Sequence, residues 1–186
     1  MMSKMDGVEK LGLFVRPGFF EDVFCARLCQ AISSADLTAA EVYDGKALAV
    51  DHTVRRTGQT LLEGSLRREA QRRLEALAPA LSAHFETPLT KTEGVSFLRY
   101  RPGDFFKPHR DRSAEHTVRQ ISVIVFLNDD YSGGELQMYG LLPDAPQVGF
   151  PVAASTGLLV AFRSTTLHEV ASVREGIRMT AVDWLS

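Results

Sequence analysis

The chain has 186 residues, of which 45% are hydrophobic, and a net charge of −2 at pH 7. This length suffices for one well-buried core, so we expect a single domain over residues 1–186. The near-neutral charge provides no global attraction to nucleic acid or to an anionic membrane. Residues 1–10 are charged and lack the apolar region of a secretory signal, and no apolar run reaches the ~18 residues of a membrane span. We therefore expect a cytoplasmic protein without membrane attachment.

Helical periodicity occurs twice in the N-terminal half. From Phe20, apolar residues recur every three or four positions, which predicts a helix with one buried stripe. Cys25 and Cys29 lie one turn apart in this stretch, which is typical of small buried residues rather than a disulfide framework. A second helical stretch runs from Ser65 to Leu81, with Pro79 as a kink or restart. The stripe of the first helix consists of Val23, Phe24, Leu28, Ala31 and Ile32.

After residue 93 the chain changes to short runs of β-branched and aromatic residues between turn signals, which predicts strands. These runs are 94–100, 120–127, 134–139, 157–162 and 179–185. Helices followed by strands indicate an α+β fold that is mainly β. We expect a double-stranded β-helix (jelly roll), in which residues 1–92 supply helices on the outer face and residues 93–186 form the core with the metal site.

A candidate metal site is formed by His109, Asp111 and the distant His168. Two imidazoles and one carboxylate on one face of an octahedron leave the other positions open, which suits Fe(II) oxygen chemistry better than closed tetrahedral zinc. Because side chains alternate along a strand, positions 109 and 111 project to the same side, and His168 must return on another strand.

Arg178 lies in a stretch that otherwise looks buried. An unpaired guanidinium there would cost several kcal/mol, so it must meet a protein carboxylate or an anionic ligand. Fe(II) with two imidazoles and Asp111 carries one positive charge, a dicarboxylate makes the total negative, and Arg178 restores neutrality. Thr180, two residues later, and the Tyr100 hydroxyl are candidates to hydrogen-bond the same carboxylate.

The stretch from Glu93 to Asp111, EGVSFLRYRPGDFFKPHRD, resembles the iron-binding segment of prolyl 4-hydroxylase-like 2-oxoglutarate oxygenases. Further similar segments follow in the family's order, and the resemblance covers roughly residues 50–186. It implies that His109, Asp111 and His168 bind iron, that Arg178 clamps the distal carboxylate of 2-oxoglutarate and that Tyr100 hydrogen-bonds it. The chain departs from the family's pattern at two positions. Arg178 stands where many relatives have a lysine, and Phe126 stands where some have a tyrosine.

The resemblance implies a dioxygenase that uses Fe(II), 2-oxoglutarate and O2, with ascorbate as an accessory reductant, and hydroxylates a C–H bond. A peptidyl substrate is the leading interpretation, with proline as one candidate target residue. The alternatives are hydroxylation of a free amino acid or other small molecule, and a non-catalytic metal-binding jelly-roll module. Nucleic acid is not favoured, because it would need aromatic stacking platforms and the aromatic residues are mostly Phe at apparent core positions. The oligomeric state is left open.

Basic residues surround the expected mouth of the site and outnumber the acidic Asp104 and Glu115. Two interpretations of this pattern stay open. The basic residues bind an acidic or extended polar substrate, or their side chains simply point to solvent. Phe105, Phe106 and Trp184 are candidates for the pocket wall. The basic residues are Arg99, Arg101, Lys107, Arg110, Arg112 and Arg119.

Overall fold

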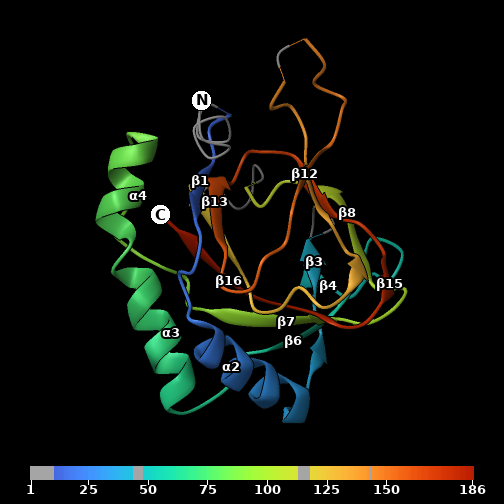
Figure 1. Cartoon of the computed structure of the whole chain (residues 1–186). Helices are drawn as coiled ribbons and strands as arrows, with labels where there is room; N and C mark the ends of the chain where they lie inside the picture. Colours follow the sequence, from blue (N-terminus) through green and yellow to red (C-terminus); the bar gives the residue numbers. More distant parts are fainter. Residues whose placement is uncertain (1–10, 44–47, 113–117, 143) are drawn as a thin grey trace, which may run out of the picture.

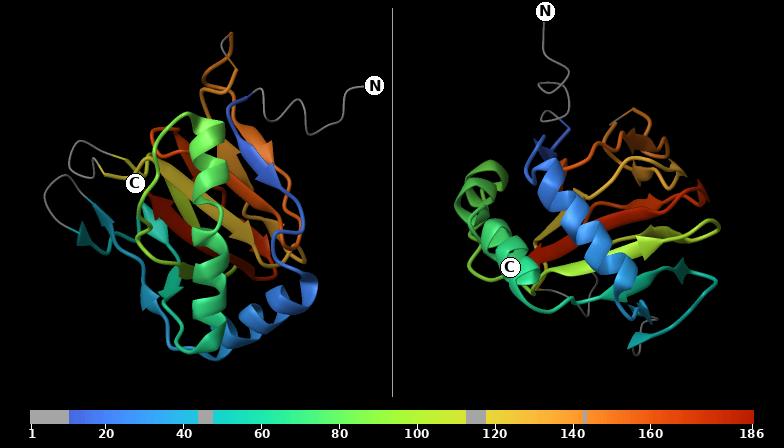
Figure 2. Two further views of the ribbon diagram at one scale, coloured as in Figure 1. Left: turned by 90° about the vertical axis from the view of Figure 1, so that its left-hand side faces the viewer. Right: turned by 60° about the horizontal axis from the view of Figure 1, so that its bottom comes forward.

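The computed structural model describes residues 11–43, 48–112, 118–142 and 144–186. Residues 1–10, to which the expectation about a secretory signal refers, lie outside the described residues, and so does Glu115. Within the described part, two antiparallel sheets pack against each other, and helices cover the outer face of the larger sheet (Figures 1 and 2). None of the described helices is long and apolar enough to span a membrane.

The helices form where the apolar periodicity predicts them. Helix α2 (Asp22–Ser34) buries Phe24, Leu28 and Ile32, as expected, whereas Val23 is 74% exposed and lies off the buried stripe. The second stretch divides into α3 (Ser65–Glu75) and α4 (Ala78–Phe85). Pro79 lies in the first turn of α4, where its missing N–H costs nothing, so the predicted restart is confirmed.

The larger sheet contains seven strands and the smaller one five. In spatial order, the larger sheet consists of β1 (Phe14–Arg16), β13 (Leu159–Arg163), β9 (Ile121–Phe126), β16 (Arg178–Leu185), β7 (Ser96–Tyr100), β6 (Gly58–Thr60) and β2 (Thr38–Ala39). The smaller sheet consists of β12 (Phe150–Val152), β11 (Leu136–Met138), β14 (His168–Val170), β8 (Phe105–His109) and β5 (Arg55–Arg56). Two further pairs are β10 (Ser132–Gly133) with β15 (Val173–Glu175), and β3 (Val42–Tyr43) with β4 (Leu48–Ala49).

The five strand-like runs after residue 93 correspond to β7, β9, β11, β13 and β16, so these predictions are confirmed. The mainly-β, antiparallel character of the fold is confirmed with them. The short strands β1 to β6 in the described part of the N-terminal half were not predicted. Each is only two or three residues long, which is too short for an alternating pattern to be visible.

Alternation along the central strands creates two separate cores. On β16, Met179 and Ala181 pack toward the helices, whereas Val182 packs toward the smaller sheet. The same alternation on β9 places Val123 and Val125 against the helices. Every second residue of the central strands therefore faces the space between the two sheets.

Candidate active site

The three residues of the predicted metal site come together between the sheets. His109 is the last residue of β8 and His168 is the first of β14, and the two lie opposite each other in this antiparallel pair. Asp111 follows two residues after His109, beyond the end of the strand. One ligand atom from each residue lies within 4.8 Å of the other two. The expected return of His168 on another strand is confirmed, although Asp111 is held by a loop.

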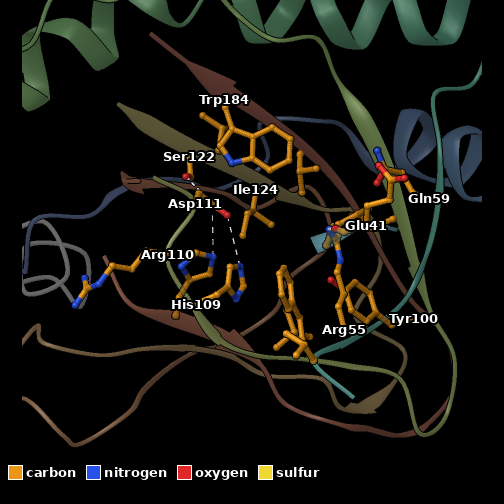
Figure 3. A pocket seen from close by; sticks show the side chains of 18 of the residues that line it. Glu41, Arg55, Gln59, Tyr100, His109, Arg110, Asp111, Ser122, Ile124 and Trp184 are labelled. Atoms are coloured by element: carbon orange, nitrogen blue, oxygen red, sulfur yellow. Dashed lines mark hydrogen bonds and ion pairs between the residues drawn. The ribbon is translucent and has the colours of Figure 1, made fainter. Parts of the chain in front are cut away.

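Backbone carbonyls determine which imidazole nitrogens can bind a metal. Nδ1 of His109 lies 2.8 Å from the Lys107 carbonyl, and Nδ1 of His168 lies 3.0 Å from the Thr166 carbonyl. A carbonyl only accepts, so each Nδ1 donates and each Nε2 keeps its lone pair. The Nε2 atoms face the Asp111 carboxylate, at 3.5 Å from Oδ1 and 3.6 Å from Oδ2 respectively (Figure 3). The two Nε2 atoms and the Asp111 carboxylate therefore lie around one common point, as the ligands of a single metal ion do.

The protonation states also suit metal binding. Burial by itself raises the pKa of Asp111, but His168, His109 and a hydrogen bond from Ser122 together outweigh it and hold the pKa below its ordinary 3.8. Burial lowers the pKa of His168 to about 4, against the opposing effect of Asp111. At neutral pH the carboxylate is therefore ionised and the His168 imidazole is neutral, which are the forms that bind metal.

Neighbouring side chains hold the three residues in place. The Ser122 hydroxyl donates to Asp111 Oδ2 at 2.7 Å and lies 2.8 Å from the Ser164 hydroxyl. The ring of Phe106 stacks on His109, with 3.4 Å between ring centroids and 16° between planes. Phe162 meets His168 edge-on at 4.7 Å. Such outer contacts orient metal ligands.

Arg178 enters the same cavity from β16. Its side chain is 1% exposed, and its Cζ lies 5.0 Å from the ring of Tyr100 and 5.3 Å from the ring of Phe126. Its Nε and Nη2 atoms are buried and have no hydrogen-bond partner within the described part of the chain. Among the described residues, no carboxylate forms an ion pair with it. The buried hydroxyl of Thr180, on the same face of β16, also lacks a partner.

Tyr131 is a further polar neighbour of Arg178 that the sequence did not reveal. Its hydroxyl is buried and has no hydrogen-bond partner among residues 11–43, 48–112, 118–142 and 144–186. Burial raises its pKa, and the nearby Arg178 guanidinium partly opposes this rise. The signal available in the sequence was an aromatic residue just before the Gly133-Gly134 turn. A Cβ at Gly134 would lie 2.9 Å from Val173 Cγ2 and 3.0 Å from Arg178 Cδ, so glycine lets the arginine stem pass.

A cavity of about 610 Å³ is lined by all six predicted site residues, whereas Tyr131 lies behind its wall. Its volume falls in the usual range of ligand sites, roughly 300–1,000 Å³. Of the predicted wall residues, Phe106 and Trp184 line the cavity. Phe105 does not, because alternation along β8 turns it to the other face, where its ring lies under Arg56.

The mouth of the cavity is less basic than the residue count suggested. Of the six predicted basic residues, only Arg110 and Arg119 line the cavity. Arg119 is bound to the Glu93 carboxylate by two hydrogen bonds of 2.7 and 2.6 Å, and Arg110 donates to the Thr165 carbonyl. Arg55, which was not predicted, also lines the cavity.

Comparison with known proteins agrees with this site. The 2OG-Fe(II) oxygenase superfamily matches residues 95–186. A PKHD-type hydroxylase of Picosynechococcus sp. is 34% identical over 155 residues, which cover 80% of this chain and 68% of that protein. Another from Acaryochloris marina is 31% identical over 159 residues, with the same coverage of 80% and 68%.

Two solved structures share the fold. A Pseudomonas putida prolyl-4-hydroxylase superposes with a TM-score of 0.78 at 22% identity, covering 97% of this chain and 95% of that one. A Trichoplax adhaerens prolyl hydroxylase, in complex with a peptide fragment of hypoxia inducible factor, gives 0.74 at 15% identity, covering 100% and 94%. The chain belongs to the 2OG-Fe(II) oxygenase superfamily, has a fold like that of prolyl hydroxylases, and is a dioxygenase that depends on Fe(II), 2-oxoglutarate and O2.

Proposed function

We propose that this dioxygenase hydroxylates a C–H bond of a peptidyl substrate, with proline as the leading target residue. We also propose that residues 1–186 form one domain, in which residues 93–186 form the core of a double-stranded β-helix and residues 1–92 support it. The observation that carries the functional proposal is the buried, unpaired guanidinium of Arg178 in the same cavity as the cluster of His109, Asp111 and His168.

The metal would be held by the Nε2 atoms of His109 and His168 and by the Asp111 carboxylate. This donor set fits Fe(II), because two imidazoles and one carboxylate on one side leave the other positions open. When bound, Fe(II) activates O2 toward an otherwise unreactive C–H bond, with 2-oxoglutarate as the electron donor. Ser122 holds the Asp111 carboxylate, and the Lys107 and Thr166 carbonyls hold the two imidazoles.

Arg178 would bind the distal carboxylate of 2-oxoglutarate. Its unpaired Nε and Nη2 form one edge of the guanidinium, the edge that holds a carboxylate through two parallel hydrogen bonds. An isolated buried charge costs several kcal/mol, and an anionic ligand offsets that cost. Thr180 has a buried, unpaired hydroxyl to add, and Tyr100 and Tyr131 lie against the guanidinium. Tyr131 would supply the hydroxyl that Phe126 lacks.

Aromatic walls complete the site by limiting the access of water. Phe106 stacks on His109, Phe162 meets His168 edge-on and Trp184 lines the cavity, so aromatic rings would flank the reacting carbon. Orienting a bound substrate in this way contributes to the rate, because it converts an encounter into a reaction between fixed groups.

The extent of the cavity supports a peptide as the substrate. It extends from the metal cluster to Thr38, Ala39 and Glu41, at the outer strand of the larger sheet. The Trichoplax relative in fold was solved with a peptide fragment. A free amino acid or other small molecule is the second candidate, because a cavity of about 610 Å³ also suits a metabolite.

The metal and co-substrate roles can be tested without knowing the substrate. Anaerobic addition of Fe(II) and 2-oxoglutarate should give a charge-transfer absorbance, and O2 should then yield succinate. His168→Ala should abolish both signals. His52→Ala is the matched control, because His52 is exposed and lies outside the cluster. Equal succinate from the wild type and His168→Ala would contradict the assignment.

The substrate class needs a separate assay. Proline-containing peptides and free amino acids are incubated with the loaded enzyme, and products are analysed for the added mass of one oxygen atom. Oxygen added to peptides supports the first proposal. Oxygen added only to free amino acids would replace it with the second.

A further inference from the structure

The guanidinium of Arg55 also lines the cavity, and the proposed co-substrate site does not use it. Arg55 lies on β5, at the edge of the smaller sheet, directly opposite Phe106 of β8. Its side chain lines the cavity together with His109 and Asp111 (Figure 3). Because residues opposite each other in a sheet share a face, the backbone pairing directs Arg55 toward the metal cluster.

Two contacts fix the position of this guanidinium. Its Cζ lies 4.6 Å from the centre of the Phe106 ring, which in turn stacks on the His109 imidazole. Its Nη1 donates to the backbone carbonyl of Glu41 at 3.1 Å. A guanidinium stacked on an aromatic ring is held as a flat, preoriented group. Arg55 is thus positioned one ring away from a proposed metal ligand.

The opposite edge of the group is left without a partner. Nε of Arg55 is buried and makes no hydrogen bond to any residue that the structure describes, and Nη1 is the atom that donates to Glu41. Within the described part of the chain, Arg55 forms no ion pair, whereas Arg119 is bound to Glu93. Glu41 lines the same cavity but contacts Arg55 through its backbone only.

The charges around the metal call for one more anion. Fe(II), Asp111, 2-oxoglutarate and Arg178 together sum to zero, and Arg119 is paired with Glu93. The other charged residues that line the cavity, Arg55, Arg110 and Glu41, therefore leave one net positive charge in a partly desolvated space. The edge formed by its Nε and Nη2 has the geometry that binds a carboxylate with two hydrogen bonds. An acidic group of the substrate meets both requirements.

We propose that Arg55 is a specificity-determining residue that binds a carboxylate side chain of the substrate, which makes acidic peptides the preferred substrate class. This proposal rests on the peptidyl function proposed above. Arg55 would act beside the reaction centre, by positioning the substrate and by discriminating against its neutral analogues.

The test compares two capped pentapeptides with a central proline, one flanked on both sides by pairs of glutamates and the other by pairs of glutamines. Binding to the protein loaded anaerobically with Fe(II) and 2-oxoglutarate is followed by the fluorescence of Trp184, the only tryptophan, which lines the cavity. The wild type should bind the glutamate peptide at least about tenfold more tightly, the ratio expected for one charge-assisted hydrogen bond.

Arg55→Gln should bring this ratio close to one. Arg56→Gln is the matched control, because it removes the same charge from the next residue, which is exposed and lies outside the cavity. It should keep the wild-type ratio. Arg55→Glu should shift the preference to a peptide with lysines in place of the glutamates, a gain that misfolding cannot produce.

Three results would overturn the proposal. They are an unchanged ratio in Arg55→Gln, an equal loss in Arg56→Gln, and a wild type that binds neither peptide or both equally. Failure of the proposed function is seen separately. An Arg55-dependent preference without oxygen added to the peptide would contradict peptidyl hydroxylation but support Arg55 as the carboxylate-binding residue.

Discussion

The Thr180 hydroxyl allows a test in which stability and affinity change in opposite directions. Oγ1 is buried without a partner, and valine has nearly the same shape without the polar atom. An unpaired buried hydroxyl costs about 1–3 kcal/mol, so Thr180→Val should raise the free energy of unfolding of the ligand-free protein. A hydrogen bond to a carboxylate contributes roughly 1.5–3 kcal/mol, so the Kd for 2-oxoglutarate should rise about 10- to 100-fold.

Thr57→Val is the matched control. Thr57 is buried too, but its hydroxyl donates to the Arg99 carbonyl at 3.0 Å and it does not line the cavity. This variant should lose about 1 kcal/mol of stability and keep its affinity for 2-oxoglutarate. Urea unfolding of the metal-free protein measures the stability. Anaerobic titration of the charge-transfer absorbance measures the affinity.

The reasoning would be refuted by a Thr180→Val variant that is less stable than the wild type and binds 2-oxoglutarate equally well. That result would mean that the hydroxyl has a partner within the folded protein and lies outside the co-substrate site. A loss of affinity in Thr57→Val of the same size would show that the effect is indirect.

Three further predictions concern other elements of the site and its support. Tyr131→Phe should weaken 2-oxoglutarate binding about tenfold, because the hydroxyl beside Arg178 is lost; an unchanged Kd in the same titration would exclude this role. Ser122→Ala should lower Fe(II) affinity about 10- to 100-fold by releasing Asp111, and equal affinities in a metal titration would contradict this. Burial raises the pKa of Asp183 to about 6 from 3.8, although Trp184, Gly94 and Gln71 donate hydrogen bonds to it. The folded state therefore holds this proton more tightly, and the free energy of unfolding should fall by at most about 3 kcal/mol as the pH rises through this range. Asp183→Asn should remove that decline in urea unfolding between about pH 4 and about pH 7, and an equal decline in both proteins would contradict the assignment.

Local chemistry in the sequence was sufficient to identify most of the candidate site. The alternation along residues 178–185 correctly placed Arg178 and Thr180 on one face, because side-chain direction in a strand depends only on position in the chain. His109, Asp111 and His168 stood out because their residue types and order match one kind of metal chemistry. The helix restart at Pro79 was predictable for the same local reason.

Only the tertiary structure decided which distant groups share the cavity. The register between β8 and β14 places His109 opposite His168, and the pairing of β5 with β8 brings Arg55 beside Phe106. The tertiary structure also pairs Arg119 with Glu93, which leaves the mouth of the cavity less basic than the composition suggested. Tyr131 reaches Arg178 only because a glycine turn lets the chain pass closely. Pairing between strands far apart in the chain depends on packing and turn geometry throughout the domain, and no local pattern contains that information.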